Sequence, residues 1–126
     1  MSDGPLGILL ISGTHERAHY AFVLAAGAAA VGRSVVLFAT NQGCRALLRD
    51  WSSLAEAARD EAVRQAGVAG LDELRQASIE LGVQLLACDS GLLMADLDPG
   101  SLVPQAEVAG VPTFLSAVRA GPIVTL

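Results

Sequence analysis

The sequence predicts an α/β fold in which a doubly wound, mostly parallel sheet is covered by helices on both faces. Its short apolar runs are continuous rather than alternating, which is typical of strands buried on both faces. Helix-like segments alternate with these runs. A glycine separates helix from strand three times, at Gly32, Gly82 and Gly121, where the end of a helix favours a left-handed residue.

The expected elements follow from these patterns in order along the chain. The first helix is Ala-rich, and Leu71, Leu74 and Leu81 repeat at helical spacing in a later one. Pro112 suits the first turn of the last helix. We expect strands at residues 6–12, 34–39, 83–87 and 122–126, helices at 15–31, 71–81 and 112–119, an exposed helix or ordered excursion at 52–70, and a turn at 96–100.

Composition restricts the class of protein. The chain has 126 residues, the size of one domain spanning 1–126. Hydrophobic residues make up 52%, which predicts a sheet buried on both faces or additional surface buried between subunits. The net charge is −5 and the eight basic residues are all Arg, without a cluster, so nucleic acid and anionic membranes are not expected partners.

The expected location is the cytoplasm. The longest apolar run, residues 21–31, is shorter than a membrane-spanning helix, and the first residues lack the positive region of a signal peptide. Two cysteines do not form a disulfide framework. In a reducing compartment each is either a small buried residue or a reactive thiol.

Ligands of doubly wound sheets bind beyond the carboxyl ends of the strands. Three loops are expected there: residues 12–15, 40–44 and 88–91. They bring both cysteines and both histidines to or near one edge of the sheet, and Asn41 belongs to the second loop. The first loop lacks a dinucleotide-binding glycine pattern, no P-loop occurs, and the chain has no Lys, so phosphate binding is not indicated.

Cys88 is the strongest candidate for chemistry. If a helix begins near Ser90 and Gly91, its free N–H groups favour a thiolate or a persulfide anion at Cys88. Asp89 acts in the opposite direction, because a carboxylate disfavours a second negative charge. The alternative is that Cys88 is simply the last core residue of a strand. Cys44 is best interpreted as an inert buried residue, and a resolving thiol or a second carrier site are the other possibilities.

The segment HERAH, residues 15–19, fits the zinc-protease pattern H-E-x-x-H. His15 and His19 would share a helix face, with Glu16 at the position of a general base. No third histidine exists, and no acid occurs between Glu16 and Asp50. A polar first helical turn therefore explains the motif better than a zinc hydrolase does. A histidine such as His15 acting as a proton partner of Cys88 is the second possibility.

Three segments together resemble the DsrE/DsrF-like sulfurtransferase family, which includes the TusD sulfur-relay proteins. The segment GVQLLACDSGLLMADL, residues 82–97, resembles the cysteine motif of that family: a hydrophobic strand ends in Ala-Cys and a short helix follows. FATNQGCRALL (38–48) and EVAGVPTFLSAVRAGPIVTL (107–126) resemble its second and last segments. The resemblance covers most of the chain.

The resemblance implies a DsrE-like (YchN-like) fold that assembles as a homotrimer or homohexamer. It also implies that Cys88 accepts sulfane sulfur as a persulfide from a donor protein and passes it to an acceptor thiol, without metal or organic cofactor. Asp89, Ser90, Gly91, His15, Cys44 and Asn41 are the expected supporting residues. The alternative is a non-catalytic binding or assembly module with the same fold, in which Cys88 is structural.

Overall fold

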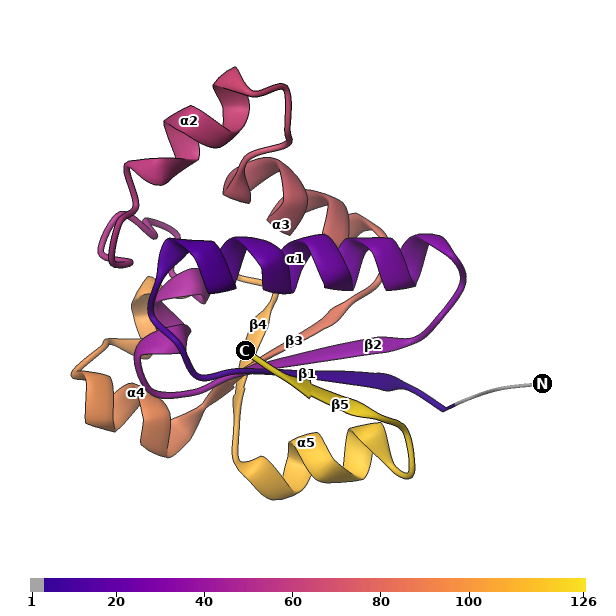
Figure 1. Cartoon of the computed structure of the whole chain (residues 1–126). Helices are drawn as coiled ribbons and strands as arrows, with labels where there is room; N and C mark the ends of the chain where they lie inside the picture. Colours follow the sequence, from indigo (N-terminus) through magenta and orange to yellow (C-terminus); the bar gives the residue numbers. More distant parts are fainter. Residues whose placement is uncertain (1–3) are drawn as a thin grey trace.

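Five parallel strands form one sheet in the order β4-β3-β2-β1-β5 (Figure 1). The structure is a computed structural model and describes residues 4–126. The strands are β1 (Leu6–Leu10), β2 (Val35–Ala39), β3 (Gln84–Cys88), β4 (Ala106–Ala109) and β5 (Ile123–Thr125). Every pairing is parallel, so the carboxyl ends of all five strands lie at one edge of the sheet. The predicted α/β fold class is confirmed.

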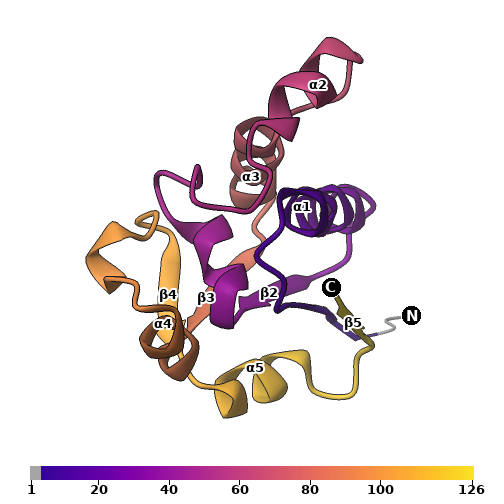
Figure 2. The same ribbon diagram turned by 60° about the vertical axis from the view of Figure 1, so that its left-hand side comes forward.

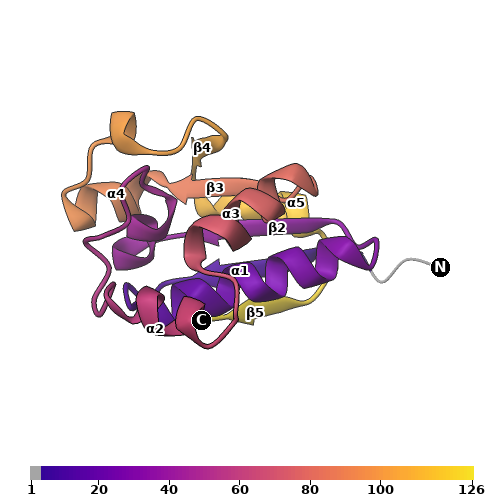
Figure 3. The ribbon, with the colours of Figure 1, turned by 90° about the horizontal axis from the view of Figure 1, so that it is seen from above.

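Helices cover both faces of the sheet, as the continuous apolar runs predict. In Figure 1, α1 (His15–Ala30) and α3 (Leu71–Glu80) lie above the sheet and α5 (Val111–Val118) lies below it. Seen from above in Figure 3, α1 and α3 run side by side over the strands. The remaining helices are α2 (Arg59–Gln65), α4 (Asp89–Ala95) and the 3₁₀ helices η1 (Asn41–Leu47) and η2 (Pro99–Ser101).

The sheet separates two hydrophobic clusters because successive side chains of a strand point to opposite faces. In β3, Leu85 and Ala87 belong to the large cluster under α1 and α3. Leu86 and Cys88 belong to a small cluster on the face of α5, which includes Phe114. The side chain of Cys88 therefore lies on the α5 face.

The predicted strands and helices lie within two residues of the observed bounds, and two other points need correction. Strand β4 was not predicted, because it is a four-residue edge strand in which Glu107 and Val108 are exposed, so no buried apolar run marks it. Gly32 and Gly82 have the expected positive φ, but Gly121 does not. Helix α5 instead ends at Arg119, with φ 57°.

The predicted excursion contains α2, which projects beyond α3 in Figure 2. Polar side chains anchor this segment: Asp60 of α2 is buried and hydrogen bonds to His15 of α1 and to the N–H of Leu71. Arg75 of α3 is also buried and donates to the carbonyl oxygens of Ala46 and Leu48 at the end of η1. Arg75 thereby fixes η1 at the edge where the strands end.

Among residues 4–126, the helices are all too short or too polar to span a bilayer.

Candidate functional site at Cys88

Cys88 is both the last residue of β3 and the N-cap of α4. Its Sγ accepts a hydrogen bond from the N–H of Gly91 at 3.4 Å. The Oγ of Ser90 lies 3.3 Å from the same sulfur. The predicted helix start is confirmed, and the sulfur occupies the capping position that an oxygen of Ser or Asp usually fills. A strand end and a helix start thus hold one thiol.

The sulfur lies close to the surface but is largely covered. Cys88 is 6% exposed and packs in the α5-face cluster with Phe38, Leu86 and Phe114. The rings of Phe38 and Phe114 stack with centroids 4.9 Å apart. The site is therefore a thiol at the rim of a small apolar cluster rather than an open surface cysteine.

Hydrogen bonding determines the charge preference of Cys88. Burial acts to raise the pKa of its thiol, but hydrogen bonds from the hydroxyl groups of Ser90 and Thr40 and the N–H groups of Gly91 and Ser90 outweigh it. The pKa of Cys88 is consequently lowered from the ordinary value of 9.0. These donors favour the thiolate, or any anionic sulfur bound there, over the neutral form.

The helix start packs against the loop after β2 so closely that Gly91 has no room for a side chain. A Cβ on Gly91 would lie 2.5 Å from both the N of Asn41 and the Oγ1 of Thr40. Asn41 itself has a positive φ of 51° at the first residue of η1. The structure thus brings Gly91, Asn41 and Thr40 together beside Cys88.

Gly91→Ala is expected to reverse the usual effect of alanine in a helix. Alanine normally stabilises a helix interior by about 1 kcal/mol relative to glycine. Here the new methyl group collides with the backbone after β2, so we expect about 1–3 kcal/mol of destabilisation. Urea unfolding measures this, with Gly27→Ala in α1 as control because nothing lies within 4 Å of its Cβ position. Equal stabilisation of both variants would contradict the close packing.

Ser90→Ala is expected to raise the pKa of Cys88, because it removes the strongest of the hydrogen bonds that lower it. The measurement is the rate of iodoacetamide alkylation of Cys88 as a function of pH. In the wild type the rate rises at a pH below the ordinary 9.0, since only the thiolate reacts. In Ser90→Ala the midpoint moves to higher pH with a similar plateau. An unchanged midpoint would contradict the role given to Ser90.

Asp89 is exposed, and its Oδ1 accepts the N–H of Ser90 at 2.7 Å. Its carboxylate oxygens lie 3.8 Å and 3.9 Å from the Cβ position of Gly110, the N-cap of α5. The sequence predicts that Asp89 opposes the thiolate. The pKa of Cys88 is nevertheless lowered, and the causes of its shift are burial and hydrogen bonds rather than Asp89.

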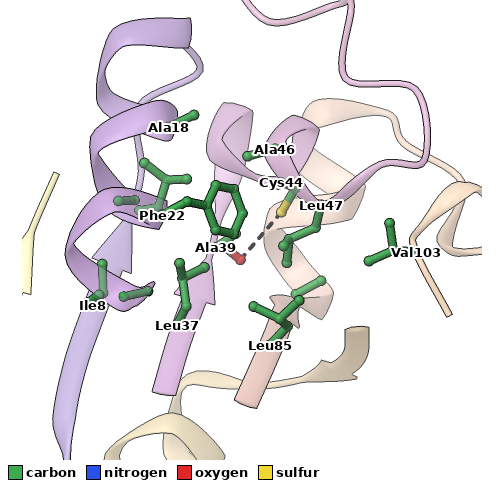
Figure 4. Packing of buried hydrophobic residues seen from close by; sticks show 14 of the residues in the cluster. Ile8, Ala18, Phe22, Leu37, Ala39, Cys44, Ala46, Leu47, Leu85 and Val103 are labelled. Carbon is green, nitrogen blue, oxygen red and sulfur yellow. Dashed lines mark hydrogen bonds between the residues drawn. The ribbon is translucent and has the colours of Figure 1, made fainter. Parts of the chain in front are cut away.

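Cys44 lies on the other face of the sheet and has a different environment (Figure 4). It is fully buried, and its thiol donates to the carbonyl oxygen of Ala39 at 3.4 Å. Burial, and to a lesser extent the negative charge of the neighbouring Cys88, raise the pKa of Cys44 to about 11. Cys44 is therefore held as a neutral thiol in the large cluster, while Cys88 points into the small one.

The structure places His15 in a separate polar cluster. The predicted pairing of His15 with Cys88 is therefore wrong, because the ring nitrogens of His15 contact Asp60 and Arg59. His15 is fully buried, and Arg59 Nη1 lies 3.2 Å from its Nδ1. Because a guanidinium only donates, Nδ1 accepts and the proton is on Nε2. Nε2 then donates to Asp60 Oδ1 at 2.8 Å. Both ring nitrogens are therefore occupied, by Asp60 and by Arg59.

The HERAH histidines share a helix face as predicted but are oriented for packing. His19 stacks on His15 with ring centroids 5.6 Å apart, and its Nε2 donates to the carbonyl oxygen of Ala69 at 2.8 Å. Glu16 is exposed in the first turn of α1, as the polar-turn interpretation predicts. Within residues 4–126, no group of three or more His, Cys, Asp or Glu side chains is placed to hold a metal ion.

Thr40 lies in the predicted loop 40–44, but the sequence did not indicate it as a supporting residue of Cys88. It is the N-cap of η1, immediately after β2, and its hydroxyl contributes to the low pKa of Cys88. No local sequence signal marks this role, because it depends on β2 and β3 being neighbours with Ala39 in register with Ala87. Thr40 follows Ala39 and Cys88 follows Ala87, so this register places the Thr40 hydroxyl beside Cys88.

Comparison with solved structures identifies the architecture. The YchN protein from E. coli superposes with a TM-score of 0.74 over 100% of both chains at 13% identity. The chain has the DsrE-like (YchN-like) fold. A protein of unknown function from Methanobacterium thermoautotrophicum, MTH1491, superposes on this fold with a TM-score of 0.57 at 15% identity, covering 97% of this chain and 99% of the other.

The likeness is one of structure and not of sequence. No family model matches the sequence, and no curated protein matches it either. The predicted resemblance to the DsrE/YchN group is therefore confirmed at the level of the fold.

Proposed function

We propose that the protein is a sulfur carrier that holds sulfane sulfur as a persulfide on Cys88 and relays it to a partner thiol. One observation carries the proposal. The Cys88 sulfur caps a helix at the carboxyl edge of the sheet, where hydrogen bonds lower its pKa. The DsrE-like fold and the resemblance of residues 82–97 to the family's cysteine motif support the same role.

The chemistry requires a thiolate and no external oxidant. The Cys88 thiolate attacks the outer sulfur of a donor persulfide, the S–S bond of the donor breaks, and the donor leaves as a thiolate. The sulfur bound to Cys88 is then itself the target of an acceptor thiolate, and the Cys88 thiolate leaves. At each step one S–S bond forms and one breaks. The donors around Sγ stabilise the anionic sulfur before and after transfer.

Mass spectrometry of the loaded protein tests the proposal. Wild type and Cys44→Ala are incubated with a persulfide donor, and both should gain the mass of one sulfur atom. Proteolysis without reductant should locate that sulfur on the peptide that contains Cys88. Addition of an acceptor thiol should then remove it. Absence of a persulfide on Cys88 with several donors would overturn the proposal.

A non-catalytic binding or assembly module is the second candidate, and the low exposure of Cys88 favours it. Several apolar side chains near the site are exposed, which suits assembly as a homotrimer or homohexamer. They are Leu93 (82%), Met94 (78%), Val108, Val111 and Leu115. In this alternative Cys88 is structural, and it reacts slowly with alkylating reagents at all pH values.

The relay assigned to Cys88 in the first proposal would operate in the cytoplasm with donor and acceptor proteins.

A further inference from the structure

The connection between β4 and α5 begins directly beside Cys88. Cys88 is in register with Ala109, the last residue of β4. From there residues 109–112, which we call the β4–α5 segment, lead to the helix on the face toward which the Cys88 side chain points (Figure 1). Ala109 packs against the same small cluster as Cys88. The Cys88 side chain thus lies between Ala109, the first residue of this segment, and the start of α4.

Access to the Cys88 side chain is restricted. Gly110 lies against the carboxylate of Asp89, the residue that follows Cys88. Cys88 is only 6% exposed, although the sulfur lies at the rim of the sheet. A second protein's thiol must approach a sulfane sulfur in line with the S–S bond that breaks, and a side chain with so little exposure leaves little room for that approach. Sulfur transfer therefore needs a movement of part of the enclosure.

Helix α5, to which the β4–α5 segment leads, is attached by few buried side chains. Only Phe114 and Val118 of α5 are buried, while Val111 and Leu115 are about half exposed. By contrast, α4 is fixed by the close contact of Gly91 with the backbone after β2. Gly110, at the junction, has no side chain to restrict its backbone. Its carbonyl oxygen accepts the N–H of Thr113 at 3.0 Å, so it belongs to the first turn of α5.

We propose that the β4–α5 segment is a movable cover over Cys88, with Gly110 as its hinge, and that displacement of the segment admits the sulfur donor and acceptor. The biological part of this inference rests on the proposed function. The physical part, access to the sulfur, does not. Closed, the segment protects the anionic sulfur from water and stray thiols. Open, it exposes the sulfur toward the apolar surface formed by Leu93 and Met94 of α4.

Gly110→Ala tests the hinge without disturbing the fold. Gly110 has φ −95° and ψ 169°, which alanine adopts freely, and its Cβ would make ordinary contacts at 3.4 Å or more. Loss of glycine's backbone freedom should slow iodoacetamide alkylation of Cys88 about threefold. The rate is measured on the high-pH plateau, where a change of pKa has no effect. Gly27→Ala is the matched control and should react as the wild type does.

Phe114→Leu tests the anchor in the opposite direction. A smaller side chain weakens the attachment of α5, so alkylation of Cys88 should be faster than in the wild type while urea unfolding remains cooperative. Equal rates in wild type, Gly110→Ala and Phe114→Leu would overturn the movable cover. Wild-type alkylation as fast as that of a free cysteine thiolate would overturn it as well.

The same variants separate this inference from the proposed function. If alkylation responds to Gly110→Ala but no persulfide forms on Cys88, the cover stands and the sulfur relay fails. If persulfide forms but alkylation is unaffected by both substitutions, the relay stands and the cover fails.

Discussion

Cys88→Ser is expected to abolish sulfur loading completely while leaving the fold intact. Serine is only slightly smaller than cysteine, and its hydroxyl oxygen can accept a hydrogen bond from the N–H of Gly91 as a conventional helix cap. The hydroxyl, however, does not ionise at neutral pH and cannot form a persulfide. We expect no gain of sulfur in Cys88→Ser, full loading in Cys44→Ala, and urea unfolding midpoints for Cys88→Ser close to wild type.

The contrast between the two cysteines makes this experiment decisive. Cys44 is buried and its pKa is raised to about 11, so a neutral thiol is present at pH 7. If Cys88→Ser still gains sulfur, the carrier is Cys44 and the environment assigned to both thiols is wrong. If neither single variant loads, and the wild type does, the two thiols act together across the end of the sheet.

Most of the fold could be predicted from the sequence because the signals that mark its elements are local. Continuous apolar runs identify strands buried on both faces, and Gly32 and Gly82 mark helix ends with positive φ. The sequence pattern did not predict strand β4, because an exposed edge strand needs no apolar run. Gly121 was misassigned for a different reason: a Cβ there would collide with the backbone of Pro5, a contact between chain ends that no local pattern reveals.

The site could be predicted only in part, because some of its contacts join residues that are far apart in the sequence. Cys88, Ser90 and Gly91 act within one helix turn, so their roles follow from the rules of helix capping. Thr40 reaches the sulfur from another strand, and its role depends on strand order. The partner of His15, Asp60, is 45 residues away in a polar excursion without a strong pattern. Buried polar pairs at such separations are set by the tertiary fold.

Asp60→Ala is expected to be the most destabilising single change outside the apolar clusters. Asp60 Oδ1 accepts both the Nε2–H of His15 and the N–H of Leu71, each at 2.8 Å. Removing the carboxylate leaves two buried donors without an acceptor, and Arg64 loses its contact with Asp60 at 3.4 Å while it keeps the one with Glu61. The expected loss is about 3–5 kcal/mol in the free energy of unfolding. Glu73→Ala, which removes an exposed acid on α3, should change it by less than about 0.5 kcal/mol.

The pH dependence of this loss identifies the carboxylate as its cause. Burial acts to raise the pKa of Asp60, but the hydrogen bonds from His15 and Leu71 outweigh it and lower the pKa. A lowered pKa contributes stability above the unfolded value of about 3.9, and this stability is lost as the pH falls through the folded value. The gap between wild type and Asp60→Ala in urea unfolding should therefore be full at pH 7 and shrink below about pH 4. A gap that is constant down to the lowest pH would mean that packing, and not the charged hydrogen bonds, anchors α2 to α1.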